Sequence, residues 1–285
     1  MSGAGPVERP GAVPLAAVLG RPVGHSRSPA LFAHWLSVHG IRGHYVPIEV
    51  APERLAEVLR VLPTLGFRGV NVTVPLKEAA LALASRASER ARAVGAANTL
   101  TFEEGGVHAD NTDGHGFLAN LREGAPGWDA SQGPAVVLGA GGAARAVLAA
   151  LLEAGAPEIR LLNRTRARAE ALAAEFGPRV ALGDWSAAPE ALREAALVVN
   201  ATSLGMAGQP PLDLDMGALP SGAVVTDLVY TPLETPLLRA ARARGCVAVD
   251  GLGMLLHQAV PGFERWFGAT PKADAAARRA ALAAA

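Results

Sequence analysis

The sequence predicts an α/β protein with two domains, the second of which is built on a parallel sheet. The chain has 285 residues, enough for two domains because single hydrophobic cores stop growing near ~250–300 residues. From residue 135 onward, β-branched runs alternate with helical patterns, which indicates a parallel sheet covered by helices on both faces. A polar stretch rich in Gly and Pro at 123–134 separates this region from a less regular first part.

In the first part, short apolar runs alternate with helical patterns. The runs at 15–20 and 68–74 are predicted to be strands. The segments 28–40 and 52–62 are predicted to be helices, because each has Pro at or near its first helical position. The first of these helices should end at Gly40.

The second part repeats strand and helix in regular order. One helix continues through L-L-E-A-G, and R-A-R-A-E-A-L-A-A-E-F-G is the next. The last predicted helix, 254–267, should be interrupted near Pro261, and the alanine-rich tail after residue 272 is either a helix or frayed. The predicted strands lie at 135–139, 159–163, 196–200, 223–230 and 246–250.

The composition excludes several classes of protein. Half of the residues are hydrophobic and the net charge is zero, so no overall charge attracts nucleic acid or an anionic membrane. No apolar run reaches the ~18–20 residues of a membrane span, and the first dozen residues resemble a flexible extension rather than a signal peptide. Cys246 is the one cysteine, and the histidines form no cluster with metal-ligand spacing. We therefore expect a soluble, cytoplasmic protein without a disulfide or a metal site.

A glycine-rich turn after the first strand of the second part indicates a dinucleotide site. Gly139, Gly141 and Ala144 match the spacing G-x-G-x-x-G/A. The first glycine permits a tight turn, the second lets the backbone approach a pyrophosphate, and the third small residue lets helix pack on strand. The motif alone is weak, but the strand before it and the helix after it support the assignment. The loop residues expected to contact the cofactor are Gly139, Ala140, Gly141, Gly142 and Ala143.

The end of the next strand indicates which dinucleotide binds. A site for NAD usually has Asp or Glu about 20 residues after the glycine motif, but this chain has N-R-T-R-A-R there. Arg164, Arg166 and Arg168 would attract a 2′-phosphate, and Asn163 and Thr165 can donate hydrogen bonds to it. The alternative is an ordinary basic helix start, which is unfavourable without an anion because it opposes the helix dipole. The predicted cofactor is NADP.

Lys77 stands out because the chain almost always uses arginine. Of 26 cationic side chains, Lys77 and Lys272 are the only lysines. An ammonium group can be desolvated and lose its proton, so it can act as an acid or a base where a guanidinium cannot. Lys77 lies just past the predicted strand that carries Asn71 and Thr73 on one face, and ligands of α/β folds bind at that end of a strand. The alternative is a chance surface residue.

Further polar residues are candidates for the same site. Ser26 and Ser28 come directly before a helix, where two hydroxyls and free amides would form a cradle for a carboxylate. Ser28 is also expected to be the N-cap of that helix. Downstream, the sequence supplies Asn98 and Asp113. Asp113 is either a turn residue or a partner that hydrogen-bonds Lys77 and sets its protonation.

These pieces together resemble the shikimate dehydrogenase family. The ordered motifs span about 13 to 268 and include S-x-S-P, N-x-T-x-P-x-K, G-A-A-N-T, N-T-D-G, G-A-G-G-A, N-R-T-x-x-R, N-A-T-S-x-G-M, D-L-V-Y and D-G-L-G-M-L-x-x-Q. The resemblance implies a mixed-sheet substrate domain at 13–117, a Rossmann-type, doubly wound NADP-binding domain at 118–252, and a helical segment at 253–285 that returns to the first domain. The implied reaction is the reversible, NADPH-dependent reduction of 3-dehydroshikimate to shikimate, a step toward chorismate and the aromatic amino acids.

The resemblance also implies roles for individual residues. Lys77 and Asp113 would be the catalytic pair, with Lys77 donating a proton to the alkoxide that hydride transfer leaves. Ser26 and Ser28, helped by Tyr230, would hold the substrate carboxylate. The ring hydroxyls would be bound by Asn71, Thr73, Asn98, Asp113 and Gln258. The 2′-phosphate would be bound by Asn163, Arg164, Thr165 and Arg168. The nicotinamide would be bordered by Thr202, Gly205, Met206 and Leu228, and by Gly251 at the junction of substrate and cofactor.

Two other functions stay open at this point. A quinate/shikimate dehydrogenase of the same superfamily would accept more substrates or use NAD, although N-R-T-R-A-R disfavours NAD. A non-catalytic NADP-sensing or shikimate-binding regulator would not need both Lys77 and Asp113. The oligomeric state is open as well, with a homodimer as one candidate.

Overall fold

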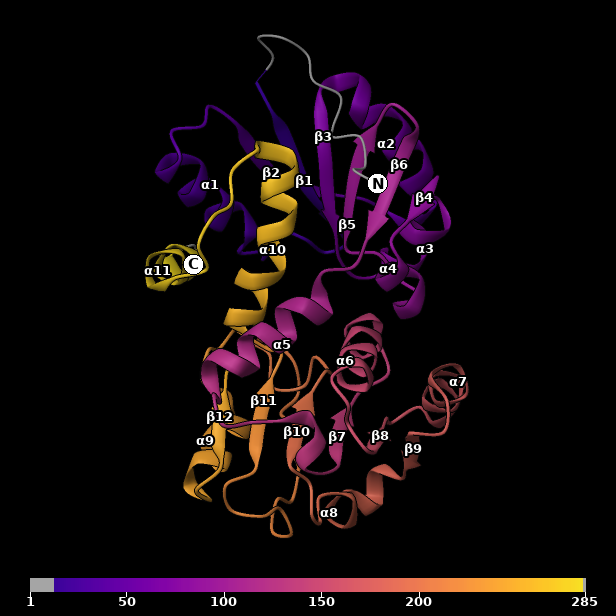
Figure 1. Ribbon diagram of the computed structural model, residues 1–285, viewed down its shortest axis with the longest axis vertical. Helices are drawn as coiled ribbons and strands as arrows, with labels where there is room; N and C mark the ends of the chain where they lie inside the picture. The colour runs from indigo at the N-terminus through magenta and orange to yellow at the C-terminus, as the bar shows by residue number, and fades with distance from the viewer. Residues whose placement is uncertain (1–12, 284–285) are drawn as a thin grey trace. The chain divides into compact units, whose positions relative to one another are not determined.

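The computed structural model describes residues 13–283, which divide into two compact units (Figure 1). The first unit consists of residues 13–112 together with 255–283, and the second is Asp113–Met254. Within 13–283, no helix has the length and apolar character needed to cross a membrane. Within the same residues, no group of three or more His, Cys, Asp or Glu side chains is placed so that it could hold a metal ion.

The first unit contains a mixed six-stranded sheet, which confirms the sheet type implied by the family resemblance. The strand order is β2-β1-β3-β5-β6-β4. β1 is parallel to β2 and β3, and β4 is parallel to β6, whereas β5 is antiparallel to both of its neighbours. The strands are β1 (Leu15–Gly20), β2 (His44–Glu49), β3 (Phe67–Val72), β4 (Arg86–Ala87), β5 (Thr99–Glu103) and β6 (Gly106–Asp110).

Alternation along β1 and β3 sends side chains into two different layers. Leu19 and Val70 belong to an aliphatic core on one face. Helix α1 brings Phe32 to an aromatic cluster that also contains Phe263 and Trp266 of α10. The helices and 3-10 turns of this unit are α1 (Ser28–Val38), η1 (Pro52–Arg54), α2 (Leu55–Val61), η2 (Leu62–Leu65), α3 (Lys77–Ala82), α4 (Glu89–Val94), α10 (Leu252–Phe267, from Leu255 onward) and α11 (Ala275–Ala283).

The structure corrects several predicted boundaries in this unit. The strand predicted at 68–74 ends at Val72, two residues before the cis peptide bond to Pro75. The helix predicted at 28–40 ends at Val38. The segment 52–62 is not one helix, because 3-10 turns open and close it around α2.

The predicted interruption at Pro261 is wrong, because α10 runs through this residue without a break. Proline removes one backbone hydrogen bond from a helix interior. Burial of apolar side chains in the following turn offsets this lost hydrogen bond, because Phe263 and Trp266 have no exposed surface. Tertiary packing therefore outweighs the local preference of the sequence.

The alanine-rich tail is a helix, which decides between the two open alternatives. Asp274 accepts the backbone N–H groups of Ala276 and Ala277 at 2.9 and 3.0 Å and so caps the start of α11. At the other end, Arg27 Nη1 donates to the carbonyl oxygens of Ala281 and Leu282, both at 3.0 Å. Arg27 lies between the two candidate serines, so the tail is tied to the loop that carries them.

The second unit is a six-stranded, all-parallel sheet, as predicted. Its order is β12-β11-β10-β7-β8-β9 (Figure 1). The order reverses between β7 and β10, and open α/β sheets bind ligands at the carboxyl ends of the two strands beside such a reversal. The strands are β7 (Ala135–Leu138), β8 (Ile159–Leu162), β9 (Val180–Gly183), β10 (Leu197–Asn200), β11 (Val224–Asp227) and β12 (Val247–Val249).

Both faces of this sheet are covered by separate cores. Val137 faces a cluster that includes Phe117 of α5 and Val147 of α6, whereas its neighbours Val136 and Leu138 face the opposite cluster. Hydrophobic side chains on both faces explain why the strands are continuous apolar runs. The helices and 3-10 turns are α5 (Asp113–Gly124), η3 (Ala130–Gln132), α6 (Gly142–Glu153), α7 (Arg166–Phe176), η4 (Trp185–Ala187), α8 (Ala188–Ala191), α9 (Pro236–Ala243) and the first turn of α10.

Candidate active site

The glycine loop lies between β7 and α6, at the reversal point of the parallel sheet. Gly139 has a φ of +110°, and a Cβ at this position would lie 2.9 Å from the carbonyl oxygen of Ala201. A glycine is therefore required for the loop to pass the end of β10. Gly141 precedes α6 in an extended conformation, and no side chain caps the helix. The first amides of α6 are thus available to a phosphate group, which fits the predicted dinucleotide.

A basic segment follows β8 next to this loop. Arg164 and Arg168 are exposed and have no ion-pair partner within residues 13–283. Arg166 is engaged differently, because its Nε lies 2.9 Å from the Glu170 carboxylate one turn later. Asn163 donates its amide to the Thr165 carbonyl oxygen at 2.8 Å and so shapes the turn. Arg164, just before α7, and Arg168, in its first turn, therefore provide two cations for a phosphate at this helix start.

A buried polar network joins the ends of β10 and β11, and the sequence interpretation missed it. Asn200 Nδ2 donates to Asp227 Oδ1 at 2.8 Å, and Thr235 Oγ1 donates to Asp227 Oδ2 at 2.7 Å. Asn200 Oδ1 in turn accepts the Thr202 hydroxyl at 2.7 Å. Asn200 and Asp227 have no exposed surface. The network therefore fixes Thr202 and the turn that carries Leu228, two residues predicted to border the nicotinamide.

Gly251 lies beside this network for a steric reason. A Cβ at position 251 would approach the carbonyl oxygen of Leu228 to 2.5 Å and that of Asp227 to 2.6 Å. The turn after β12 thus passes directly against the turn after β11. A larger residue at 251 would push apart the two segments predicted to contact the cofactor.

Asp227 gives a pH-dependent stability prediction. Burial raises the pKa of its carboxyl above the ordinary value, although Thr235, Val229 and Asn200 donate hydrogen bonds to it. A raised folded-state pKa means that the contribution of this group to stability is present below the unfolded pKa. That contribution is lost as the pH rises from there through the folded pKa. We expect the melting temperature of the wild type, relative to Asp227→Asn, to fall as the pH rises from about 4 toward neutrality.

The amide is a suitable comparison for this test. Its oxygen can accept from Asn200 and Val229, and its NH₂ group can donate to Thr235. Asp213→Asn, which makes the same change at an exposed position, is the matched control. A melting-temperature difference at position 227 that stays constant or increases with pH would contradict the prediction.

In the first unit, Lys77 is the first residue of α3 and is half-buried. Its carbonyl oxygen accepts the Ala97 amide at 2.9 Å, which ties α3 to the segment that leads to Asn98. Thr73 lies just after β3 rather than within it. Asp113 begins the second unit, so the pairing of Lys77 with Asp113 stays a prediction.

Asn98 organises the residues directly before Asp113. Its Nδ2 donates to Thr112 Oγ1 at 2.9 Å and to Gln258 Oε1 at 3.1 Å, and its Oδ1 accepts the Thr112 amide at 2.8 Å. Thr112 Oγ1 also donates to the Gln258 carbonyl oxygen at 2.8 Å. The structure thus brings together two predicted substrate-binding residues, Asn98 and Gln258. It also uses both amide hydrogens of Asn98 within the protein.

The serine motif opens α1 in a different way from the one predicted. Arg27 occupies the N-cap position and makes no side-chain cap bond, so the assignment of Ser28 as N-cap is wrong. Ser28 is instead the first helical residue, and its amide donates to Ser26 Oγ at 3.3 Å. Steric preference explains the shift, because Pro29 is favoured in the first turn of a helix, where its missing N–H has no intrahelical partner. Tyr230 follows β11 in the second unit.

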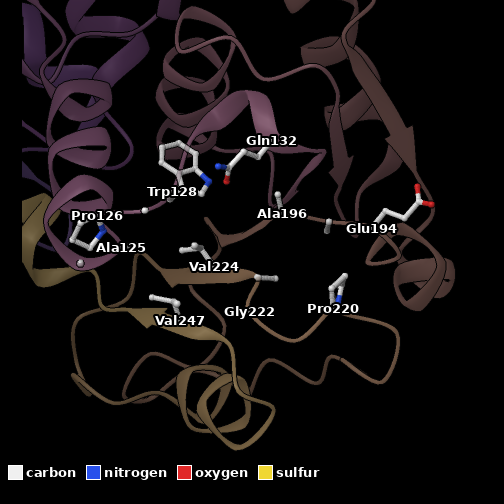
Figure 2. Close-up of a pocket in the computed structure, with 14 residues that line it drawn as sticks. Ala125, Pro126, Trp128, Gln132, Glu194, Ala196, Pro220, Gly222, Val224 and Val247 are labelled. Atoms are coloured by element: carbon white, nitrogen blue, oxygen red, sulfur yellow. The ribbon is translucent and has the colours of Figure 1, made fainter.

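A hollow of about 540 Å³ in the second unit does not belong to this site (Figure 2). Trp128, Pro220, Val224 and Val247 line it, with Glu194 at its margin. Val224 and Val247 are the first residues of β11 and β12. The hollow therefore lies at the amino ends of the strands, whereas the glycine loop and the Asp227 network lie at the carboxyl ends.

Comparisons with known proteins agree along the chain. Three family profiles match: "Shikimate dehydrogenase substrate binding domain" over 18–100, "Shikimate / quinate 5-dehydrogenase" over 125–206, and "Shikimate 5'-dehydrogenase C-terminal domain" over 251–281. The chain is 62% identical over 272 residues to the shikimate dehydrogenase (NADP(+)) of Dinoroseobacter shibae, which covers 95% of this chain and 98% of that protein.

Two solved structures are similar over nearly the whole chain. Shikimate 5-dehydrogenase from Thermus thermophilus, in complex with NADP(H) and shikimate, aligns with a TM-score of 0.86 and 42% identity and covers 96% of this chain and 100% of that one. Quinate dehydrogenase from Corynebacterium glutamicum, in complex with NAD, aligns with a TM-score of 0.87 and 33% identity over 95% and 99% of the two chains. The two structures thus contain different dinucleotides, NADP(H) in the first and NAD in the second.

Proposed function

The chain belongs to the shikimate dehydrogenase family, and we propose that it catalyses the reversible NADPH-dependent reduction of 3-dehydroshikimate to shikimate. The observation that carries this proposal is the 62% identity over 95% of the chain to an NADP(+)-dependent relative. The basic end of β8, where an NAD site usually has a carboxylate, supports the same cofactor.

Within this proposal, the substrate carboxylate is bound by Ser26 and Ser28 with help from Tyr230. The ring hydroxyls are bound by Asn71, Thr73, Asn98, Asp113 and Gln258. Asn98 also positions Gln258 and the chain before Asp113, because its Nδ2 donates to Gln258 Oε1 and to Thr112 Oγ1.

Lys77 and Asp113 carry the proton transfer in this proposal. Bound NADPH supplies the hydride that reaches the ketone carbon. The Lys77 ammonium donates its proton to the ketone oxygen, which would otherwise become an alkoxide, and in the reverse direction the amine accepts that proton. Asp113 accepts a hydrogen bond from the ammonium and keeps Lys77 oriented. The cofactor is held by the glycine loop, by Asn163, Arg164, Thr165 and Arg168, and by Thr202, Leu228 and Gly251.

The division of labour is part of the proposal. Residues 13–117 bind the substrate, 118–252 bind NADP, and 253–285 return to the substrate domain. We place the enzyme in the cytoplasm, where a reducing environment suits a chain with one cysteine. A homodimer stays a prediction that light scattering would test.

The absorbance of reduced nicotinamide tests the function directly. Shikimate and quinate are each supplied with NADP or NAD, and shikimate with NADP should give the highest kcat/KM. Equal or faster turnover of quinate with NAD would favour the broader quinate/shikimate enzyme instead. Binding of shikimate and NADP without turnover would favour the non-catalytic regulator.

The serine assignment gives a separate prediction. Ser26→Ala and Ser28→Ala should each weaken shikimate binding about 10- to 150-fold, because a hydrogen bond to a charged group contributes roughly 1.5–3 kcal/mol. NADP affinity should not change, since in this proposal the two hydroxyls contact the substrate carboxylate and not the cofactor. Calorimetry with each ligand measures both effects. Ser37→Ala, in the exposed last turn of α1, is the control, and weakened NADP binding in the first two variants would remove these serines from the substrate site.

A further inference from the structure

Arg27 lies between the two serines assigned to the substrate carboxylate, and its side chain holds the last helix of the first unit. Its Nη1 donates to the carbonyl oxygens of Ala281 and Leu282, both at 3.0 Å. These two residues lie in the last turn of α11, where backbone carbonyls have no partner within the helix. The half-buried side chain of Arg27 therefore spans from the serine segment to the carboxyl end of α11.

A second contact fixes the other end of the same helix. Trp35, two turns into α1, donates its indole N–H to the carbonyl oxygen of Lys272 at 3.0 Å, just before α11 begins. Because α1 and α11 pack against each other, these contacts place them antiparallel, with the end of α11 beside the start of α1. The buried residues of α11 are Ala277 and Ala281, and such small side chains contribute little hydrophobic stabilisation. The hydrogen bonds at its two ends are therefore important for fixing α11.

The local backbone connects the Arg27 side chain to the two serine hydroxyls. Ser26 and Ser28 are its direct neighbours in the chain, and the Ser28 amide donates to Ser26 Oγ at 3.3 Å. The Ser26 amide in turn donates to the Val23 carbonyl oxygen at 3.0 Å. Arg27 occupies the N-cap position of α1 without a side-chain cap bond, and its guanidinium extends to α11 instead. A shift of the Arg27 backbone would therefore move both hydroxyls.

The charge at this helix end also affects carboxylate binding. The carboxyl end of a helix carries a partial negative charge of about half an elementary charge. At the end of α11, this charge lies one arginine side chain away from the serine segment. It would disfavour an anion there if nothing offset it. The Arg27 guanidinium offsets it, because it binds the carbonyl oxygens of the helix end directly.

We propose that Arg27 is a positioning residue that holds Ser26 and Ser28 in the geometry that binds a carboxylate, by attaching their segment to the carboxyl end of α11. The ligand group is the carboxylate of a small ring acid, and α11 is the support that keeps its binding segment in place. This inference deepens the proposed function and rests on its assignment of the two serines to the substrate carboxylate. Arg27 acts through these neighbours, since its guanidinium is bound to the helix.

Arg27→Met tests this role, because methionine keeps an unbranched side chain but has no hydrogen to donate. The KM for shikimate should rise about 5- to 20-fold, less than the 10²-fold that a misplacement of about 1 Å can cost, because both hydroxyls stay in the site. The kcat and the KM for NADP should stay within about twofold of wild type, since the change affects carboxylate binding rather than the reacting centre. An unchanged KM for shikimate would overturn the proposal.

The methyl ester of shikimate separates a loss of carboxylate geometry from a general distortion of the first unit. The ester keeps the ring hydroxyls but carries no negative charge, so the serine segment contributes less to its binding. In calorimetry, Arg27→Met should weaken binding of the acid about 5- to 20-fold and binding of the ester less than about twofold. A purely structural role would not change the ratio of the two affinities, so equal losses for acid and ester would contradict the positioning role.

Arg279→Met is the matched control, because it makes the same change at an exposed position of the same helix. Its affinity for shikimate should equal that of the wild type. If Arg279→Met weakened shikimate as much as Arg27→Met does, the effect would come from loss of positive charge in general and the proposal would fail.

A combination with serine variants separates this inference from the proposed function. In the double variant Ser26→Ala/Ser28→Ala, adding Arg27→Met should have a clearly smaller effect on shikimate affinity, because no hydroxyl is left to position. Fully additive losses would overturn the positioning role while leaving the serines in the substrate site. An unchanged shikimate affinity in the serine double variant itself would overturn the serine assignment and this inference together.

Discussion

Lys77→Ala is expected to lower turnover by a factor on the order of 10²–10⁴, the usual contribution of acid–base catalysis. Shikimate binding should change little, because the proton is needed in the transition state rather than in the bound substrate. Lys77→Arg should also be nearly inactive, since a guanidinium rarely gives up its proton. The turnover number and a calorimetric dissociation constant for shikimate measure the two quantities separately.

In the structure, a backbone atom of Lys77 makes the contact that holds α3 in place, so the side chain can be changed in this test. The contact that anchors α3 to the segment before Asn98 uses the carbonyl oxygen of Lys77 rather than its side chain. Both variants should therefore fold. Lys272→Ala removes the chain's other lysine at an exposed position and is the control. Near-native turnover of the arginine variant would contradict proton transfer by Lys77 and leave it an electrostatic role alone.

The second unit was largely predictable because its strands are buried on both faces. Continuous apolar runs such as 135–138 and 197–199 give a strong signal with little dependence on neighbouring strands. β9 was not predicted, because it is a four-residue strand at the sheet edge with two exposed residues. The predicted strand at 223–230 was too long, since it ends at Asp227, whose side chain accepts hydrogen bonds from the turn that follows.

The first unit was less predictable because its strands mix polar and apolar residues. β2 is an edge strand that contains Pro47 and several exposed side chains, which are typical of protected sheet edges. β5 and β6 form a hairpin with charged residues at its end. The mixed sheet came from the family resemblance rather than from local patterns.

Residues with unusual chemistry were found from the sequence, whereas residues that support them were not. Lys77 and the glycine loop stand out by composition or spacing. The network of Asn200, Asp227 and Thr235 was not predicted, although two of these residues lie in the motifs N-A-T-S-x-G-M and D-L-V-Y, because its hydrogen bonds join segments that are far apart in the sequence. A buried polar side chain is recognisable only once the partners that satisfy it are known.

The basic segment after β8 gives the second large prediction, a change in cofactor preference. The 2′-phosphate is the difference between NADP and NAD, so discrimination must come from groups that touch it. A hydrogen bond to a charged group contributes roughly 1.5–3 kcal/mol, and two arginines would give a preference on the order of 10²–10⁴. Arg164→Ala combined with Arg168→Ala should remove this preference by lowering kcat/KM for NADP. The values for NAD should stay nearly constant.

Arg166→Ala is the matched control for this double variant. Arg164 lies just before the N-cap of α7, and Arg166 and Arg168 lie in its first turn. Arg166 is already paired with Glu170 at 2.9 Å, so its loss should affect NADP far less. Asn163→Asp added to the double variant should then favour NAD, because a carboxylate at the end of the second strand holds the ribose hydroxyls and repels a phosphate.

The measurement is kcat/KM for both cofactors at fixed shikimate, repeated at higher salt. Screening weakens exposed charge contacts, so the NADP preference of the wild type should decrease with salt, whereas the double variant should show little change. A double variant that still prefers NADP would place the phosphate site elsewhere on the second unit.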